Sequence, residues 1–556
     1  MKPGQTICPL CKDSVDKLVY RFHYDSERVV IDKIRAEFPE WTKDDGLCSR
    51  CLDFFHSEIV MEQRILPSIG PHFPIRTADD FIVIPTGLRM NADPRFTGKG
   101  ITICFIDSGF YPHADLTATK NRIKKIVDIP NLSESSKVLS FGEDLGEVGP
   151  SWHGTMTSVV CAGDGYLSRG LYRGIASDAE LVLLKVQDKK GRITTENIVK
   201  ALEWILENHE EYGIRILNIS LGSDEIVSYK QSKIDKLAEQ AIEKGIVIVA
   251  AVGNDANAAI KPPANSLNVI AVGGVDDNNI LDQTFSKVYH SSYGKTIDEL
   301  MKPELVAHAI WIAAPILPGT VTQKEAEALY YLTGINDEQL IPELKNFSSA
   351  IELHDSICES DNIELVREKM LQHIRNCKYI SPHYMHVDGT SFAAPIVSSI
   401  IAQLLEINPD LTPAGIREIL FSTAKRINDV ASEQQGFGLV QPRKAVLKIL
   451  KRETITKPNL SPHVNQDKKT IGFYVRHDCA SQISLSGSFN HWAQDELLME
   501  PGKNGLWQLE IPILTAGRYH YKFFVDNKTW IEDFDNPYRE PDGFNGFNSI
   551  LIIEPN

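Results

Sequence analysis

Ser391 stands between a tight turn and a long apolar run, within residues 389–395. Gly389 permits the turn because it lacks a Cβ, and Pro395 fits the first turn of a helix. Apolar residues then recur at helical spacing, at Ile396, Ile400, Ile401, Leu404 and Leu405. We therefore expect Ser391 at the N-terminus of a buried helix, where the helix dipole favours developing negative charge. A helix N-cap is the alternative, so a nucleophilic role requires a base and an orienting acid elsewhere.

Both partners stand upstream. The apolar run from Ile101 to Ile106 is typical of a strand and ends in Asp107, and a further apolar helix opens at His153. A histidine can take the proton of a serine hydroxyl, and a carboxylate can fix the tautomer of that histidine. The order Asp, His, Ser is one of the known chain orders of this triad. The three residues predict nucleophilic catalysis by Ser391.

With these residues the chain resembles the subtilisin-like serine proteases, or subtilases. The resemblance covers residues 85–450 and rests on five motifs in family order. They are Asp107-Ser108-Gly109, His153-Gly154-Thr155, Asn218-Ile219-Ser220-Leu221-Gly222, Ala251-Val252-Gly253-Asn254 and Gly389-Thr390-Ser391-Phe392-Ala393-Ala394-Pro395. The resemblance implies a serine endopeptidase, with polypeptide as substrate, built on a three-layer fold.

The resemblance also assigns roles to residues between the triad members. Asn254 matches the asparagine that donates to the oxyanion, although Gly253-Asn254 is also a good turn dipeptide. Ser220, Leu221 and Gly222 match the segment that pairs with the substrate backbone. Ala251 and Gly253 would line the pocket for the side chain before the cleaved bond. Calcium is common in the family, but no ligand loop in this sequence is clear enough to assign.

Residues 76–451 alternate short apolar runs with amphipathic segments. We expect strands at residues 181–186, 214–219, 246–251 and 269–272, and helices at 197–207 and 233–244. Strands this apolar, separated by helices, predict an α/β fold whose parallel sheet is covered on both faces. Residues 320–380 insert charged, helix-periodic sequence before the serine. This helical insertion could serve as a lid, a partner site or surface packing.

Two C-x-x-C pairs lie near the N-terminus, Cys8 with Cys11 and Cys48 with Cys51. Four converging thiolates make a tetrahedral site that suits Zn²⁺. A redox C-x-x-C and two unrelated pairs are the alternatives, but a redox site needs only one pair. We therefore predict a structural zinc ion in a zinc-ribbon or treble-clef module over residues 1–75. The sequence does not identify a partner for this module, and a protein is one candidate.

In the C-terminal segment, the spacing of apolar residues changes from that of helices to that of strands. After a polar, proline-containing stretch that we expect to be a linker (residues 452–466), residues alternate as in strands, for example in Trp507, Leu509, Ile511 and Ile513. Residues 467–556 therefore predict an all-β sandwich. Three motifs resemble the glycogen-binding modules of AMP-activated kinase β subunits, which have an immunoglobulin-like fold. These are Gly487-Ser488-Phe489-Asn490-His491-Trp492, Tyr521-Lys522-Phe523-Phe524-Val525-Asp526 and Phe547-Asn548-Ser549.

This second resemblance implies binding of glycogen or another α-glucan. Glucans are recognised by flat aromatic faces with polar groups at their edge. The positions that match the family are Trp492, Lys522, Trp530, Phe544 and Asn548. The alternative is that both tryptophans belong to the sandwich core. Some modules of this family have lost sugar binding and dock proteins instead.

The chain has 556 residues and a net charge of −16, which argues against a general nucleic-acid binder. No apolar signal-peptide core follows Met1, and the longest apolar runs, at residues 245–253 and 309–317, are too short to span a membrane. We therefore expect a cytoplasmic serine endopeptidase directed to α-glucan, with no membrane partner. The alternatives are a processing protease for one precursor and a scaffold that binds peptides without cutting them.

Overall fold

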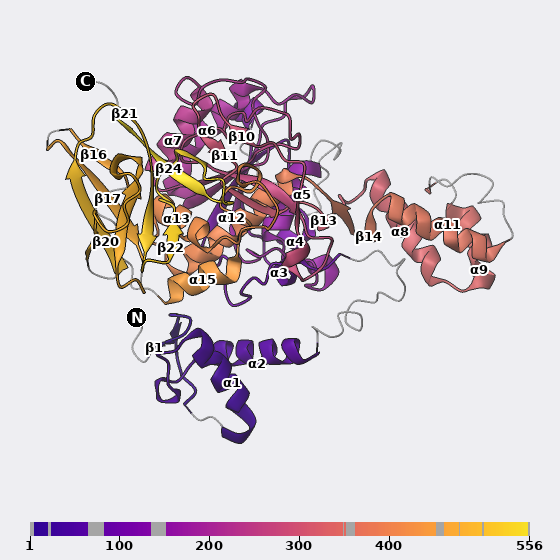
Figure 1. Ribbon diagram of the computed structural model, residues 1–556. Coiled ribbons are helices and arrows are strands. Elements are labelled where there is room, and N and C mark those ends of the chain that lie inside the picture. Colours follow the sequence, from indigo (N-terminus) through magenta and orange to yellow (C-terminus); the bar gives the residue numbers. More distant parts are fainter. Residues whose placement is uncertain are drawn as a thin grey trace.

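The computed structural model describes residues 5–20, 24–64, 83–134, 152–347, 350–351, 362–451, 461–466, 468–477, 479–502 and 505–553. Its centre is an eight-stranded sheet in the order β12-β8-β7-β6-β3-β5-β4, with β9 paired to β8 (Figure 1). Neighbours along this path are parallel, and β9 is antiparallel. The strands are β3 (Thr102–Asp107), β4 (Ile123–Asp128), β5 (Glu180–Lys185), β6 (Ile214–Ile219), β7 (Val247–Ala251), β8 (Ile270–Asp276), β9 (Lys287–Val288) and β12 (Leu305–His308).

Helices cover both faces of this sheet. In β3, Ile103 and Phe105 belong to one buried cluster, whereas Cys104 and Ile106 belong to another, because successive side chains of a strand point to opposite faces. The first cluster takes in α5 (Trp152–Ala162), α12 (Thr390–Ile407), α13 (Pro413–Thr423) and α15 (Pro442–Leu450). The second takes in α6 (Thr195–Tyr212) and α7 (Lys233–Glu243). The predicted three-layer α/β fold is confirmed.

Helix α12 is the central helix of the first face. It is long and apolar enough to cross a membrane by length and composition. The apolar runs of the sequence did not predict this property, because serine and glutamine interrupt the run in this helix. However, 83% of it is buried inside the protein, against α5, α15 and the sheet. Burial in the core therefore explains its apolar character.

Shorter elements complete the α/β body, residues 83–451. They are α3 (Thr86–Arg89), α4 (Ala114–Thr117), α14 (Ser432–Gln435), β10 (Gly294–Lys295) and β11 (Met301–Lys302). The helical insertion follows β13 (Ile312–Pro315) and consists of α8 (Val321–Gly334), α9 (Asp337–Phe347) and α11 (Ile363–Asn376). Strands β14 (Tyr379–Ser381) and β15 (Tyr384–Val387) then lead back to α12, with β15 paired to both β13 and β14. In Figure 1 the insertion projects away from the body.

The N-terminal module contains β1 (Thr6–Ile7), β2 (Ser14–Val15), α1 (Tyr24–Glu37) and α2 (Ser49–Arg64). It lies against the α/β body, and its apolar side chains share one buried cluster with α12 and α15. Arg443 of α15 pairs with Glu37 over 2.8 Å and lies over the Phe54 ring at 4.4 Å. Residues 65–82, which cross the expected boundary at residue 75, lie outside the described residues.

The C-terminal domain has two antiparallel sheets that share one core, which includes Trp507. One sheet is β16 (His463–Asn465), β17 (Thr470–Arg476), β20 (Leu506–Pro512) and β19 (Glu500–Pro501). The other is β18 (Ile483–Gly487), β21 (Gly517–Val525), β24 (Phe547–Ile553) and β23 (Arg539–Pro541), with β22 (Thr529–Ile531) paired to β21. Because β16 pairs with β17, the domain begins inside the expected linker, and residues 452–460 of that linker lie outside the described residues.

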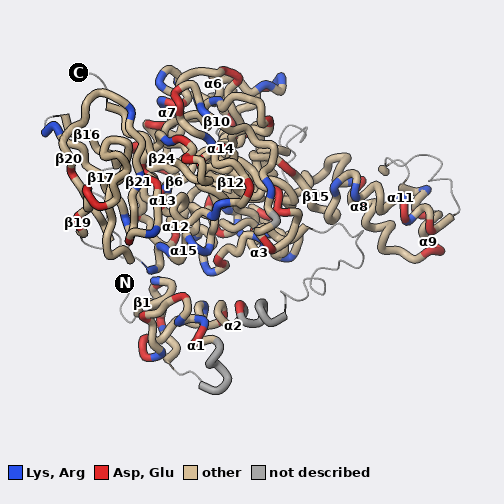
Figure 2. Tube along the Cα trace, viewed as in Figure 1, with Lys and Arg blue, Asp and Glu red and all other residues tan. Residues whose placement is uncertain are grey.

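The C-terminal domain docks directly on the α/β body. Buried Arg539 donates to the carbonyls of Met301 and Pro303 over 3.1 and 3.3 Å, and Arg426 pairs with Glu532 over 2.7 Å. Figure 2 shows basic and acidic residues interspersed over the N-terminal module, the α/β body and the C-terminal domain in this view.

Candidate active site

Asp107 and His153 meet at the carboxyl edge of the sheet. Asp107 ends β3, and His153 lies in the first turn of α5, with its Nδ1 2.7 Å from Asp107 Oδ1. Gly154 makes this approach possible, because a Cβ there would lie 2.3 Å from the Gly109 carbonyl. The other carboxylate oxygen accepts a hydrogen bond from Thr157, one turn along α5, over 3.1 Å. The carboxylate is therefore held on both sides.

The Asp107 carboxylate sets the charge state of His153. Burial lowers the pKa of His153, but the charge of Asp107 and its hydrogen bond outweigh burial, so the pKa is raised above its usual value. Asp107 Oδ1 also accepts from the Ser108 backbone N–H over 2.6 Å. An aspartate on Nδ1 leaves Nε2 as the nitrogen that can accept a proton.

Ser391 lies in the first turn of α12. This helix begins directly after Gly389, whose φ of 131° few other residues adopt. The Ser391 hydroxyl donates to the Ser220 carbonyl over 3.3 Å, and no hydrogen bond joins it to His153 in this structure. The ring of the next residue, Phe392, lies 6.0 Å from the His153 ring. Catalytic hydrogen bonds are often absent before substrate binds, and a rotation about the Ser391 Cα–Cβ bond changes the direction of its hydroxyl.

Asn254 is fixed by the residue before the serine. Its side-chain oxygen accepts hydrogen bonds from the Thr390 backbone N–H over 2.8 Å and from the Thr390 hydroxyl over 2.9 Å. These contacts determine which way the amide is oriented, and no described residue accepts a hydrogen bond from its Nδ2. A donor held in this way beside α12 can stabilise an oxyanion.

The expected substrate segment follows β6. The Ser220 hydroxyl donates to the Ser391 carbonyl over 2.9 Å, so this side chain braces α12, while Gly222 is exposed. Gly253 follows β7 with φ 107°, and a Cβ there would lie 2.9 Å from the Ser292 hydroxyl. Ala251, the last residue of β7, is half-buried. All five expected substrate residues therefore lie at the ends of β6 and β7, on the edge that carries Asp107.

Three of the candidate carbohydrate residues lie on one sheet of the C-terminal domain, Lys522 in β21, Trp530 in β22 and Asn548 in β24, whereas Trp492 and Phe544 lie in turns. The rings of Trp492 and Trp530 are 6.1 Å apart at 76°, and the two side chains are 37% and 38% exposed, so neither is core. Trp492 has a φ of 60°, which is uncommon for a bulky residue. Tyr521 pairs with Ser549, so the antiparallel register places Lys522 across from Asn548. Phe544 is 90% exposed.

Lys522 differs from its expected role. It is buried, and its ammonium pairs with Asp542. Asp542 also accepts from the backbone N–H groups of Phe544 and Gly546 over 2.7 and 3.0 Å. The lysine therefore anchors the turn that presents Phe544. Asp542 was missed from the sequence because only the folded turn brings it to Lys522.

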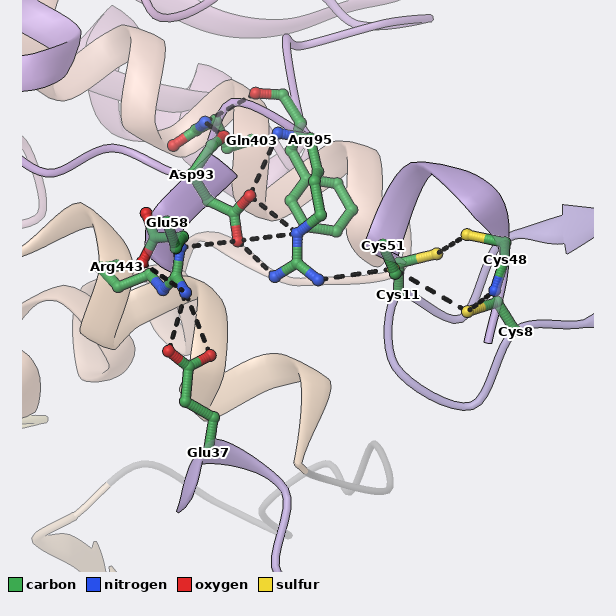
Figure 3. A network of polar contacts seen from close by, with 11 residues as sticks. Cys8, Cys11, Glu37, Cys48, Cys51, Glu58, Asp93, Arg95, Gln403 and Arg443 are labelled. Carbon is green, nitrogen blue, oxygen red and sulfur yellow. Dashed lines mark hydrogen bonds and ion pairs between the residues drawn. The ribbon is translucent and has the colours of Figure 1, made fainter. Parts of the chain in front are cut away.

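The four N-terminal cysteines converge (Figure 3). Their sulfur atoms lie within 4.8 Å of one another, with 3.9 Å between Cys8 and Cys51 and 3.7 Å between Cys11 and Cys48. Zinc–sulfur bonds of about 2.3 Å in a tetrahedron put sulfurs roughly 3.8 Å apart, so the cluster fits Zn²⁺. The Cys48 backbone N–H donates to Cys8 Sγ over 3.4 Å. By contrast, Cys104 and Cys161 are single buried thiols whose pKa burial raises.

Two family models match the chain. A model described as the subtilase family matches residues 98–438, and a model described as the glycogen recognition site of AMP-activated protein kinase matches residues 474–556. The first match contains both partners of the Asp107–His153 pair, together with Asn254 and Ser391. The second contains Trp492, Lys522, Trp530, Phe544 and Asn548.

Individual relatives are proteases. Serine protease AprX of Bacillus subtilis is 29% identical over 63% of this chain and 67% of its own length. Subtilisin-like protease 3 of Pseudogymnoascus destructans is 28% identical over 39% of this chain and 46% of its own length. The chain thus spans about two thirds of AprX and less than half of the fungal protein. Among solved structures, fervidolysin from Fervidobacterium pennivorans aligns with a TM-score of 0.43 and 18% identity, over 79% of this chain and 53% of its own.

Proposed function

Because the chain belongs to the subtilase family, we propose that it is a serine endopeptidase that cleaves polypeptides through an acyl-enzyme. The observation that carries the proposal is the hydrogen-bonded Asp107–His153 pair on the same sheet edge as Ser391 and Asn254. His153 removes the proton from Ser391 as the hydroxyl attacks the peptide carbonyl, and later returns it to the leaving amine. Asp107 stabilises the imidazolium that forms between these steps.

The oxyanion is stabilised by two donors. Asn254 Nδ2 is held by the Thr390 contacts to its side-chain oxygen, and the Ser391 backbone N–H lies at the start of α12, where the dipole favours negative charge. The substrate backbone runs beside residues 220–222, and Ala251 and Gly253 border the pocket for the preceding side chain. Exposed Gly222 lets that backbone approach closely.

The proposal includes a structural zinc ion held by Cys8, Cys11, Cys48 and Cys51. Buried Arg95 and the Cys48 N–H donate hydrogen bonds to two of the sulfurs, as outer partners of metal-bound thiolates do. The ion would fix the N-terminal module against the protease body.

We further propose that the C-terminal domain holds the protease on glycogen or another α-glucan. The support is the family match over residues 474–556 and the exposed aromatic group of Trp492, Trp530 and Phe544. A cytoplasmic setting is also part of the proposal, since none of the described cysteines forms a disulfide.

Labelling with a fluorophosphonate probe, together with casein hydrolysis, tests the protease. Wild type should react with the probe and hydrolyse casein, and Ser391→Ala should do neither. Ser399→Ala is the matched control, because its hydroxyl lies two turns along the same helix and donates to the Ile396 carbonyl over 2.6 Å. A wild type that resists the probe and leaves casein intact would instead favour the peptide-binding scaffold.

Affinity electrophoresis in glycogen gels tests the second function. The whole protein in a Ser391→Ala background should be retarded, and both Trp492→Ala and Trp530→Ala should abolish the retardation. Tyr166→Ala, which removes an exposed aromatic side chain of the protease body, should migrate like the background. Unretarded background protein would mean that the domain docks proteins rather than glucan.

A further inference from the structure

The helical insertion contains a second group of metal-ligating side chains. Glu325 comes from α8, His373 from α11, and Cys377 caps the C-terminus of α11. One oxygen, one nitrogen and one sulfur of these residues lie within 4.8 Å of one another. No motif in the sequence pointed to this group, because the glutamate is 48 positions from the histidine.

Both close contacts in the group use the same histidine nitrogen. Nε2 of His373 lies 2.9 Å from Glu325 Oε1 and 3.6 Å from Cys377 Sγ. One imidazole nitrogen carries either a proton or a lone pair in the ring plane, so it cannot serve both neighbours well. A cation between the three atoms accepts the nitrogen lone pair, the carboxylate and the thiolate together.

The distances suit a small tetrahedral ion. Zinc bonds of about 2.0–2.3 Å to nitrogen, oxygen and sulfur place neighbouring ligand atoms roughly 3.3–3.6 Å apart. The nitrogen–sulfur distance already lies at this value, and the nitrogen–oxygen distance needs a small opening. Histidine and cysteine at positions i and i+4 of a helix lie on one face, so α11 presents both ligands together.

The surroundings also suit a metal. The second oxygen of Glu325 accepts a hydrogen bond from the Tyr379 hydroxyl over 2.6 Å, which orients the carboxylate as outer partners of metal ligands do. The side chains of Glu325 and His373 are 9% and 18% exposed, so an ion can enter from solvent. A dication with one carboxylate, one thiolate and neutral histidine has no net charge, which reduces the cost of burial.

We propose that Glu325, His373 and Cys377 bind a second Zn²⁺ ion, with solvent as the fourth ligand. The ion joins α8 to α11, and through Tyr379 it joins both helices to β14. Ser391 follows Cys377 by only 14 positions, through the β14–β15 hairpin. The ion therefore fixes the insertion at the point where the chain returns to the active site. With three protein ligands, this site loses its ion to a chelator before the four-cysteine site does.

Zinc content of the whole protein tests the proposal. In a Ser391→Ala background that is loaded with ZnSO₄ and desalted, Cys377→Ser and Glu325→Gln should each bind one equivalent less than the background. Cys479→Ser, which removes an exposed thiol of the C-terminal domain, is the matched control and should bind the same amount. Equal zinc in all four folded proteins would overturn the proposal.

A cobalt titration gives a second answer in a protein whose four-cysteine site is disrupted. In a variant with Cys8→Ser and Cys11→Ser, Co²⁺ should still produce the absorption of a tetrahedral ion with one thiolate ligand, and adding Cys377→Ser should remove it. A variant that shows no thiolate band leaves Glu325 and His373 as an ion pair and excludes the site. Neither outcome bears on the serine protease activity.

Discussion

Arg95 donates a hydrogen bond from Nη1 to the sulfur of Cys51 over 3.5 Å, and so joins the four-cysteine cluster to the protease body (Figure 3). Its Nε donates to Asp93 over 2.9 Å. The Asp93 carbonyl accepts from Gln403 of α12 over 2.8 Å. A chain of buried contacts thus runs from the cysteine cluster to the helix that carries Ser391. The N-terminal module is part of the protease structure.

Replacing Cys8 and Cys11 by serine should therefore destabilise the protease as well as the module. Without a metal ion, the Cys51 sulfur to which Arg95 donates is no longer held as a charged thiolate, so a hydrogen bond to a charged group, worth about 1.5–3 kcal/mol, is weakened, and α2 loses its anchor. Calorimetry in the Ser391→Ala background should show a lower melting temperature for the main transition. Cys479→Ser should leave that transition unchanged. If the protease melts as before, the two parts are energetically independent.

The pH profile should report the Asp107–His153 pair. His153 must be neutral to act as a base, and its pKa is raised above 6.5. The value of kcat/KM should therefore rise with pH through an apparent pKa above 6.5. The same raised pKa means that the pair stabilises the fold at low pH and that this contribution is lost as pH rises past it.

Asp107→Asn should move that profile in the opposite direction. Without the carboxylate, burial alone acts on His153, so the apparent pKa should fall below 6.5, and kcat should drop by about 10⁴ because the tautomer is wrong. Asp188→Asn, which alters a surface carboxylate paired with Arg192, is the control. If kcat/KM of Asp107→Asn rises with pH through the same apparent pKa as wild type, a group other than His153 sets that pKa.

Thr390 should act through Asn254. Asn254→Ala should lower kcat roughly 10²–10³-fold with KM little changed. Thr390→Val removes one of the two hydrogen bonds that orient the amide and should lower kcat about tenfold, within the range of one lost hydrogen bond. Thr390→Ser keeps the hydroxyl and should restore most activity. A change confined to KM in Thr390→Val would place this residue in substrate binding instead.

Local sequence patterns predicted most of the central sheet and its covering helices. Strand β6 falls at the predicted residues 214–219, because a continuous apolar run between helices has few other solutions. Strand β8 runs to Asp276, beyond the predicted end at residue 272. Gly273 and Gly274 break its apolar pattern, yet a Cβ at Gly274 would lie 2.4 Å from Ala309, so close packing requires glycine there.

Contacts between distant segments were not predictable from patterns. Arg95, Lys522 and Asp542 are of residue types that are usually exposed. Only the fold brings Arg95 to Cys51 and Lys522 to Asp542. The order of motifs predicted that Asp107 and His153 meet, but not that the Ser391 hydroxyl turns to Ser220. That direction depends on one side-chain rotation.

Asp542 should matter for glucan binding without contacting the aromatic pair. Asp542→Ala frees the N–H groups of Phe544 and Gly546 and leaves Lys522 without its buried partner. The turn that presents Phe544 should loosen, and glycogen affinity should fall several-fold in affinity electrophoresis. Asp526→Ala alters a turn carboxylate that holds Ser481 and Gln482 instead, and should bind like the background. Equal affinity in both variants would exclude Phe544 from the binding surface.

The C-terminal domain should unfold together with the protease. Arg539 is fully buried at the junction, where it bonds two protease carbonyls and lies 4.3 Å above the Phe437 ring and 5.0 Å from the Phe547 ring. Arg539→Ala leaves both carbonyls without this donor and opens a space between the rings. The loss should be about 1–3 kcal/mol for each buried carbonyl left without a donor.

Arg518→Ala is the matched comparison at the same junction. Arg518 pairs with Glu299 and Glu540, but its side chain is 34% exposed, and exposed ion pairs contribute about 0–1 kcal/mol. Calorimetry in the Ser391→Ala background should show one main transition for the parent and for Arg518→Ala. Arg539→Ala should show a separate, earlier transition for the C-terminal domain. If Arg539→Ala melts like Arg518→Ala, the buried guanidinium does not couple the two domains, and glucan bound at one end would not stabilise the other.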